Sequence, residues 1–122
     1  MIDTGKAFSG FSVDDVSAAR EFYEKTLGVT VTEQNGMLQL TVAGGAQMLV
    51  YPKPNHEPAS FTILNFPVPD VEAAVDELTS RGVSFLRYEG FDQDDKGIFR
   101  GGGPLIAWFN DPAGNVLSVV AA

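Results

Sequence analysis

The chain has 122 residues, which is the length of one domain, and it contains no cysteine and a single histidine. Without cysteine it has no disulfides, no thiolate metal site and no cysteine nucleophile. Its 8 lysines and arginines against 16 aspartates and glutamates give a net charge of −8. This charge disfavours binding to nucleic acid or to an anionic membrane surface and attracts a cationic small molecule.

The chain carries no sequence signal for a membrane or for secretion. Its apolar runs, such as Leu105–Phe109, are far shorter than the roughly 20 residues that span a bilayer. The N-terminal segment lacks the basic and then apolar layout of a signal peptide. We therefore expect a cytoplasmic protein with no membrane partner.

The first half of the chain predicts one helix among four strands. In Val16–Leu27 the apolar residues recur at helical spacing, Asp15 is placed to cap the N-terminus, and Gly28 is placed to end the helix. Between strands, Asn35-Gly36 is typical of a type I′ hairpin turn, which needs positive φ at both central residues. The expected strands of this half are Ala7–Val13, Val29–Glu33, Met37–Val42 and Gln47–Tyr51.

The second half predicts the same order of elements after a proline-rich linker at 53–58. Its helix is Val71–Arg81, with Asp70 as the cap and Gly82 at the end. Its expected strands are Phe61–Val68, Ser84–Tyr88, Leu105–Phe109 and Val116–Val120.

The two halves also repeat at the level of residues. Val13–Ala19 and Val68–Ala74 are identical at five of seven positions, at an offset of 55. One helix cannot cover a four-stranded sheet on its own, so two such halves bury what neither buries alone. We therefore expect one domain over residues 1–122, built from a first βαβββ module at 6–52 and a second at 59–122.

Two motifs at the ends of the chain carry a family resemblance. The pattern from Val13 to Val29 (Val-x-Asp-Val-x-x-Ala-x-x-Phe-Tyr, then Leu-Gly-Val) resembles the opening of the vicinal oxygen chelate superfamily, and Trp108–Leu117 (Trp-Phe-x-Asp-Pro-x-Gly-Asn-x-Leu) is similar to its ending. That superfamily holds glyoxalase I, bleomycin-resistance proteins, fosfomycin-resistance enzymes and extradiol dioxygenases. The resemblance implies an α+β fold in which two βαβββ modules form a cupped, eight-stranded mixed sheet. It also implies a ligand in the cup and a homodimer.

The residues at the family's metal positions do not suit a metal. In metal-dependent relatives, histidines and glutamates on inward strand positions hold one divalent ion. The matching positions here are Phe8, Leu49, Ile63 and Ser118. Three of these side chains have no donor atom, and a hydroxyl is a weak ligand for such ions. We therefore expect no metal or other cofactor, and neither a metal-dependent glyoxalase nor a metal-dependent dioxygenase.

The remaining polar and aromatic residues of these strand faces define a predicted ligand pocket. Ser12, Tyr51 and Asn65 share strand faces with the positions that match the family's metal ligands, because strand side chains alternate with period two. Trp108 is expected to stack on a ligand, and Arg100, in a long glycine-rich loop, meets an anionic group if that loop acts as a lid. The predicted ligand-binding residues are Phe8, Ser12, Leu49, Tyr51, Ile63, Asn65, Arg100, Trp108 and Ser118.

Two other segments are predicted to be solvated loops without a functional role. His56 lies in the proline-rich linker and is expected to be a solvated loop residue. Asp92–Ile98 has the opening of a calcium loop, but Lys96 and Gly103 stand where that loop needs oxygen ligands. We expect a solvated acidic loop there.

Three functions remain open from the sequence. The first is a metal-free protein that binds or sequesters a small aromatic or cationic molecule, as bleomycin-resistance proteins do. The second is a small-molecule enzyme of lyase, isomerase or dioxygenase type, which either binds a metal through ligands at positions other than the four matched ones or works without a metal through tyrosine and arginine. The third is a dimeric fold that has no ligand. No residue is assigned a catalytic role.

Overall fold

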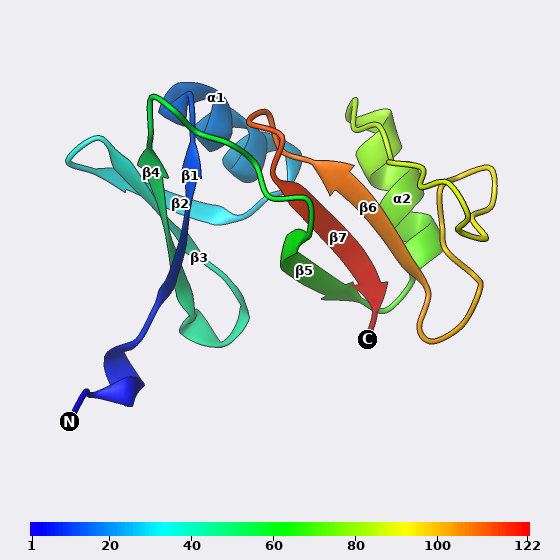
Figure 1. The fold of residues 1–122 in the computed structure, drawn as a ribbon, viewed down its shortest axis with the longest axis horizontal. Coiled ribbons are helices and arrows are strands. Elements are labelled where there is room, and N and C mark those ends of the chain that lie inside the picture. Colours follow the sequence, from blue (N-terminus) through cyan, green and yellow to red (C-terminus); the bar gives the residue numbers. More distant parts are fainter. The chain divides into compact units, whose positions relative to one another are not determined.

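The computed structural model describes residues 1–122, apart from the side chain of Ala43. It divides into two compact units, Met1–Glu57 and Pro58–Ala122, and each unit combines one sheet with one main helix (Figure 1). None of the helices in the described part of the chain has the length and apolar character needed to cross a bilayer.

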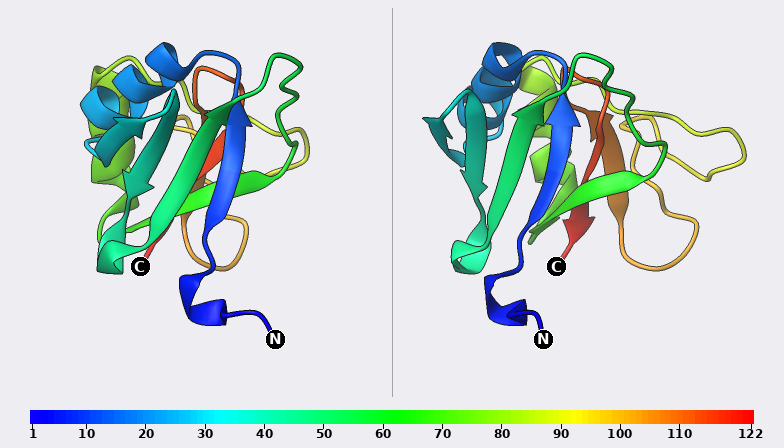
Figure 2. Two further views of the ribbon diagram at one scale, coloured as in Figure 1. Left: turned by 90° about the vertical axis from the view of Figure 1, so that its left-hand side faces the viewer. Right: turned by 60° about the vertical axis from the view of Figure 1, so that its left-hand side comes forward.

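The first unit contains a four-stranded sheet in the order β1-β4-β3-β2. β1 runs parallel to β4, whereas β3 is antiparallel to both of its neighbours. Figure 2 shows β1, β4 and β3 side by side. The strands are β1 (Ser9–Val13), β2 (Thr30–Gln34), β3 (Met37–Thr41) and β4 (Gln47–Pro52). Short 3₁₀ turns lie at Thr4–Lys6 and Ala43–Gly45.

The helix of this unit changes its winding half-way. α1 (Val16–Glu21) is followed directly by a turn of π-helix, Phe22–Thr26. There the hydrogen bonds reach further back, as from the Leu27 amide to the Phe22 carbonyl at 3.0 Å. Together these turns occupy the segment predicted as one helix.

Turn chemistry and side-chain alternation build this first sheet. Asn35 and Gly36 have φ of 56° and 75°, as the predicted type I′ hairpin requires. Buried side chains alternate along the strands and face α1, where the Tyr23 ring is fully buried with its centroid 5.9 Å from that of Phe11. The other face of the sheet carries no helix of its own unit.

The second unit repeats this arrangement with three strands. They are β5 (Thr62–Val68), β6 (Ile106–Asn110) and β7 (Val116–Ala121), in the order β5-β7-β6. β5 is parallel to β7, and β6 is antiparallel to β7. The helix α2 (Val71–Ser80) packs on β6 and β7 over a core of apolar side chains, the deepest of which are Val75, Ile98, Phe109 and Leu117.

The prediction of an eighth strand at Ser84–Tyr88 is wrong, and the structure has seven strands in two sheets. This segment makes only an isolated bridge, between Phe85 and Phe109. An antiparallel ladder from that bridge would next bring Tyr88 beside Ile106, but Phe99 occupies the place and its amide donates to the Ile106 carbonyl at 2.8 Å. The rest of the mixed α+β prediction is confirmed, whereas a single cupped sheet is not.

Candidate functional site

One row of side chains crosses the second sheet on the face opposite α2. The β-sheet register places Asn65, Ser118 and Trp108 beside one another on β5, β7 and β6. Their neighbours Phe109 and Leu117 are fully buried on the α2 side, and strand side chains alternate, so the three residues share the helix-free face. The structure therefore brings three of the predicted ligand residues together.

A hydrogen bond joins two members of this row. The Ser118 hydroxyl is fully buried and donates to the Asn65 Oδ1 at 2.5 Å. Asn65 itself is exposed. The row thus combines a buried hydroxyl with an accessible amide.

The third member of the row, Trp108, belongs to a cluster of four aromatic rings. The aromatic cluster consists of Tyr88, Phe91, Phe99 and Trp108. Ring centroids lie 5.3 Å apart for Tyr88–Trp108, 5.7 Å for Phe91–Trp108 and 5.3 Å for Phe91–Phe99. Such tilted and edge-to-face pairs contribute about 0.5–1.5 kcal/mol each beyond area burial. Phe91 nevertheless remains 49% exposed, so the cluster offers an open aromatic surface.

Sequence reasoning had identified only Trp108 of this cluster. Tyr88 ends the segment predicted as a strand, and Phe91 and Phe99 lie in the loop after it, where neither helical nor strand periodicity singles them out. The available signal was the presence of two phenylalanines in a loop that is otherwise rich in glycine and charged residues.

Gln93 holds the loop that carries these rings. Its amide nitrogen Nε2 donates to the carbonyls of Leu86 and Gly97 at 2.9 and 2.8 Å, and its Oε1 accepts from the Tyr88 amide at 2.8 Å. One side chain therefore replaces the backbone partners that a further strand would supply.

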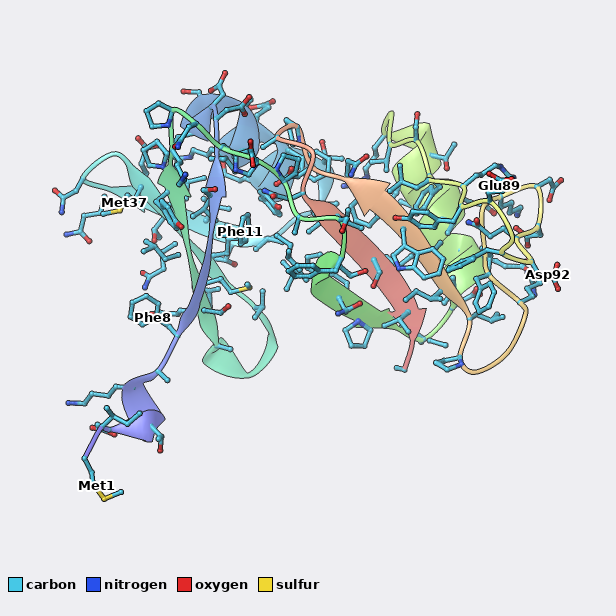
Figure 3. The ribbon with its side chains drawn as sticks, in the orientation of Figure 1. Met1, Phe8, Phe11, Met37, Glu89 and Asp92 are labelled. Carbon is cyan, nitrogen blue, oxygen red and sulfur yellow. The ribbon has the colours of Figure 1, made fainter. Side chains whose placement is uncertain are left out.

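Asp94 organises the tip of the same loop. Its Oδ1 accepts from the amides of Lys96 and Ile98, at 3.0 and 2.9 Å, and its Oδ2 accepts from Arg100 Nε at 2.8 Å. Burial by itself raises the pKa of Asp94, but the hydrogen bonds from Arg100 and from the two amides outweigh it and hold the pKa below its usual value. Figure 3 shows Glu89 and Asp92 on this loop, away from the sheet.

Two ion pairs connect the loop to α2. Arg100 Nη2 contacts Glu72, and Lys96 Nζ lies 3.0 Å from Asp76. The hydrogen bonds from Arg100 to Asp94 and Glu72 raise its pKa, and that to Asp76 raises the pKa of Lys96. Arg100 stays a predicted ligand contact, but its guanidinium is held by two carboxylates, and an anionic ligand would have to displace one of them.

The predicted residues of the first unit lie along β1 and β4. Leu49 pairs with Gly10 and Tyr51 pairs with Ser12, all on the helix-free face of that sheet. Phe8 precedes β1, is 69% exposed, and points to the side of the chain opposite Phe11 (Figure 3). A shallow depression of about 130 Å³ on this sheet includes Leu49 among its lining residues.

His56 is not the solvated residue that the sequence predicted. Its Nδ1 lies 2.6 Å from the Ser12 Oγ, and the imidazole is half-buried. The linker turns back because the His56 amide donates to the Lys53 carbonyl, while the Lys53 amide donates to the Val13 carbonyl at the end of β1. Proline spacing alone did not reveal this contact.

The residues at the implied metal positions do not fit a metal ion. Phe8, Leu49 and Ile63 offer no donor atom, and the Ser118 hydroxyl is engaged by Asn65. Ile63 lies at an irregularity of the β5–β7 pairing. Across the described residues, no three histidine, aspartate or glutamate side chains gather as a metal site would need, and the Asp94 carboxylate serves its own loop.

A hollow also lies in the second unit. It has a volume of about 370 Å³ and lies between α2 and the 83–97 segment, with Asp76, Arg87, Asp95 and Lys96 among its lining residues. Charges of both signs line it, and Lys96 and Asp76 are paired with each other. It shares no residue with the Asn65–Ser118–Trp108 row.

Comparisons with known proteins agree with this architecture. The family model for the Glyoxalase/Bleomycin resistance protein/Dioxygenase superfamily matches residues 8–119. No curated protein shows significant sequence similarity to the chain.

Solved structures of similar fold cover almost the whole chain. TnmS3, an antibiotic-binding protein from a Streptomyces species, is 25% identical with a TM-score of 0.68, covering 98% of each chain. A glyoxalase family protein from Enterococcus faecalis is 20% identical with a TM-score of 0.70, covering 98% of this chain and 99% of that one. A superfamily member from Sphaerobacter thermophilus is 22% identical with a TM-score of 0.69, covering 95% and 97%. With the family model spanning 8–119, the chain belongs to the glyoxalase/bleomycin resistance protein/dioxygenase superfamily.

Proposed function

We propose that this protein binds and sequesters a small, flat, largely apolar molecule, and that it does so without a metal. The observation that carries the proposal is the aromatic cluster, because Phe91 leaves an open aromatic surface beside Trp108. Burial of apolar area contributes roughly 25 cal/mol per Å², and aromatic surfaces add geometric preference for flat partners.

The loop that carries the aromatic cluster supports this function. A binding surface costs less affinity when it is already ordered before the ligand arrives. Gln93 closes the base of the loop, and the Arg100–Glu72 and Lys96–Asp76 pairs join it to α2. The rings of Phe91 and Phe99 are thereby positioned in advance.

The similarity to TnmS3 gives independent support. That protein is described as antibiotic-binding and shares 25% identity with this chain over 98% of its length. The side chains at the four positions that match the family's metal ligands, Phe8, Leu49, Ile63 and Ser118, are those of a pocket that holds a molecule by burial and hydrogen bonding.

Calorimetric titration of the intact chain with a panel of flat aromatic compounds tests the proposal. We expect micromolar binding, quenching of Trp108 fluorescence, and a loss of at least tenfold in Phe91→Ala, since truncating a well-packed aromatic anchor costs more than about 1.4 kcal/mol. Phe61→Ala is the matched control, because Phe61 is 69% exposed and no described residue makes a ring contact with it. No binding by any compound, or equal losses in both variants, would refute the proposal.

The proposal also covers the domain organisation, the cellular location and the oligomeric state. We take the chain to be one domain of two βαβββ modules, at 6–52 and 59–122, and to form a cytoplasmic two-fold homodimer with an isologous interface. Light scattering at micromolar concentration should give twice the mass of the 13.1 kDa chain. A particle of one chain mass would contradict the dimer.

A second candidate function is a metal-free enzyme that uses the Ser12–His56 pair. The 2.6 Å contact allows the His56 imidazole to take a proton from the Ser12 hydroxyl, and Tyr51 pairs with Ser12 across the sheet. A fluorophosphonate probe that labels Ser12 in the intact protein, with labelling lost in His56→Ala, would favour this candidate. Absence of labelling leaves the binding function as the better account.

A further inference from the structure

The Asn65 amide has a fixed orientation because it accepts from a buried hydroxyl. Ser118 is 0% exposed, and its hydroxyl has no other partner among the described residues than the Asn65 side chain. A buried donor without an acceptor costs about 1–3 kcal/mol, whereas an oxygen with an unused lone pair costs less. The hydroxyl therefore donates, and the carbonyl oxygen of the Asn65 amide faces Ser118.

The opposite end of this amide is free to bind a ligand. No described group accepts from the Asn65 Nδ2, and the residue is exposed. The indole nitrogen of Trp108, on the other side of Ser118 in the same row, likewise has no acceptor among the described residues. The row thus presents two N–H donor groups on one face of the sheet.

The two donor groups come from strands that have one further strand between them. Asn65 and Trp108 lie on strands separated by β7, so their backbones are about 9.5 Å apart. This separation is comparable with the long axis of a fused two- or three-ring aromatic system. No acidic or basic residue belongs to the row itself.

From this arrangement we infer that the ligand of the aromatic cluster carries a carbonyl-type acceptor oxygen, which binds the Asn65 Nδ2 while the ring system packs against Trp108. The inference rests on the proposed binding function and specifies its ligand. An ammonium group at this position would face N–H donors and find no acceptor, so the net charge of −8 does not set the preference here.

Fluorenone and fluorene provide a matched pair of probes. They share one three-ring skeleton and differ in a carbonyl group that replaces a methylene group. Titration calorimetry on the intact chain should show fluorenone binding about fivefold tighter or more, the value of one hydrogen bond. Equal affinities, or tighter binding of the cationic tricycle proflavine than of fluorenone, would overturn the inference and leave aromatic binding intact. If none of the three probes binds, both the proposed function and the inference are wrong.

The variant Asn65→Asp separates the donor from the acceptor. It keeps an oxygen for the Ser118 hydroxyl but removes the outward N–H donors, so the preference for fluorenone should disappear while fluorene affinity stays the same. Asn55→Asp makes the same change in the 53–58 linker, where the Asn55 Oδ1 accepts from Lys53 Nζ at 2.7 Å, and should keep the preference. A preference that survives in Asn65→Asp contradicts the assignment. If that variant does not fold, the wild-type affinity ratio decides.

Discussion

Asp15 and Asp70 lie 55 residues apart and cap their helices with the same geometry. Each carboxylate accepts from the backbone amide three residues on, Ala18 in one case and Ala73 in the other, at 3.0 Å. Their backbone angles also agree, with φ and ψ of −138° and 104° for Asp15 and −141° and 102° for Asp70. The repeat in the sequence is therefore also a repeat of a hydrogen-bonding device.

Removal of either cap should destabilise the protein to a similar extent. Asp15→Ala and Asp70→Ala each lose the acceptor for a helix amide, and we expect about 1 kcal/mol less free energy of unfolding in each variant. Urea titration followed by circular dichroism measures this loss. Asp14→Ala, at an exposed position outside the cap, is the control and should change stability by less than about 0.5 kcal/mol. Equal losses in all three variants would contradict the capping assignment.

Gln93 should matter more for the loop than for the fold. Gln93→Ala removes the partner of the Tyr88 amide and of two carbonyls, so we expect the loop to open locally while the sheet persists. Hydrogen exchange should then accelerate at the Tyr88 amide at least tenfold, and Gln34→Ala on the exposed end of β2 should leave it unchanged. Unaltered exchange in Gln93→Ala would show that the loop is held by other contacts.

Acidification should weaken the tip of the loop through Asp94. The folded-state pKa of this carboxyl is lower than its unfolded value, so the stability it contributes is fully present above the unfolded value near 3.8 and is lost as pH falls through the folded value. The difference in melting temperature between the wild type and Asp94→Asn should be largest above about pH 5 and shrink below about pH 4. Asp92→Asn provides the control. A difference that does not change with pH would contradict the assignment.

Divalent metals should leave the protein unchanged. Phe8, Leu49, Ile63 and Ser118 supply no adequate set of ligands, so we expect no stoichiometric zinc, nickel, manganese or iron in protein purified without a histidine tag. Elemental analysis measures the content, and a melting curve with each added metal tests for binding that purification removed. A metal retained at one ion per chain and lost on altering these residues would refute the metal-free proposal.

The sequence predicts those parts of the fold that depend on neighbouring residues. Two helix starts, at Asp15 and Asp70, and the turn at Asn35-Gly36 depend only on residues that are close in the sequence. The structure has all three. The segment at Ser84–Tyr88 has strand-like composition, but its ladder is displaced by Phe99, eleven residues or more along the chain. The pattern of residues within the segment does not reveal that Phe99 pairs with β6 in its place.

In the candidate site, too, the sequence predicts what depends on neighbouring residues and misses contacts between distant ones. Alternation along strands places Asn65, Ser118 and Trp108 on one face, which the register shows. Phe91 and Phe99 reach Trp108 only because Gln93 and Asp94 fold their loop, and each of those side chains acts on backbone groups that the sequence does not identify. Likewise, the Ser12–His56 contact joins positions 44 residues apart.

The bridge of Phe99 to β6 has a consequence for solubility. A strand at the border of a sheet exposes unpaired amides and carbonyls to which another chain can add, and this is a route to aggregation. On the outer side of β6, Phe99 and Ile106 are bridged near one end, while the Leu86 amide donates to the Trp108 carbonyl further along. The loop that presents aromatic rings therefore also shields the border of its sheet, and loosening it should expose a surface on which copies of the protein self-associate.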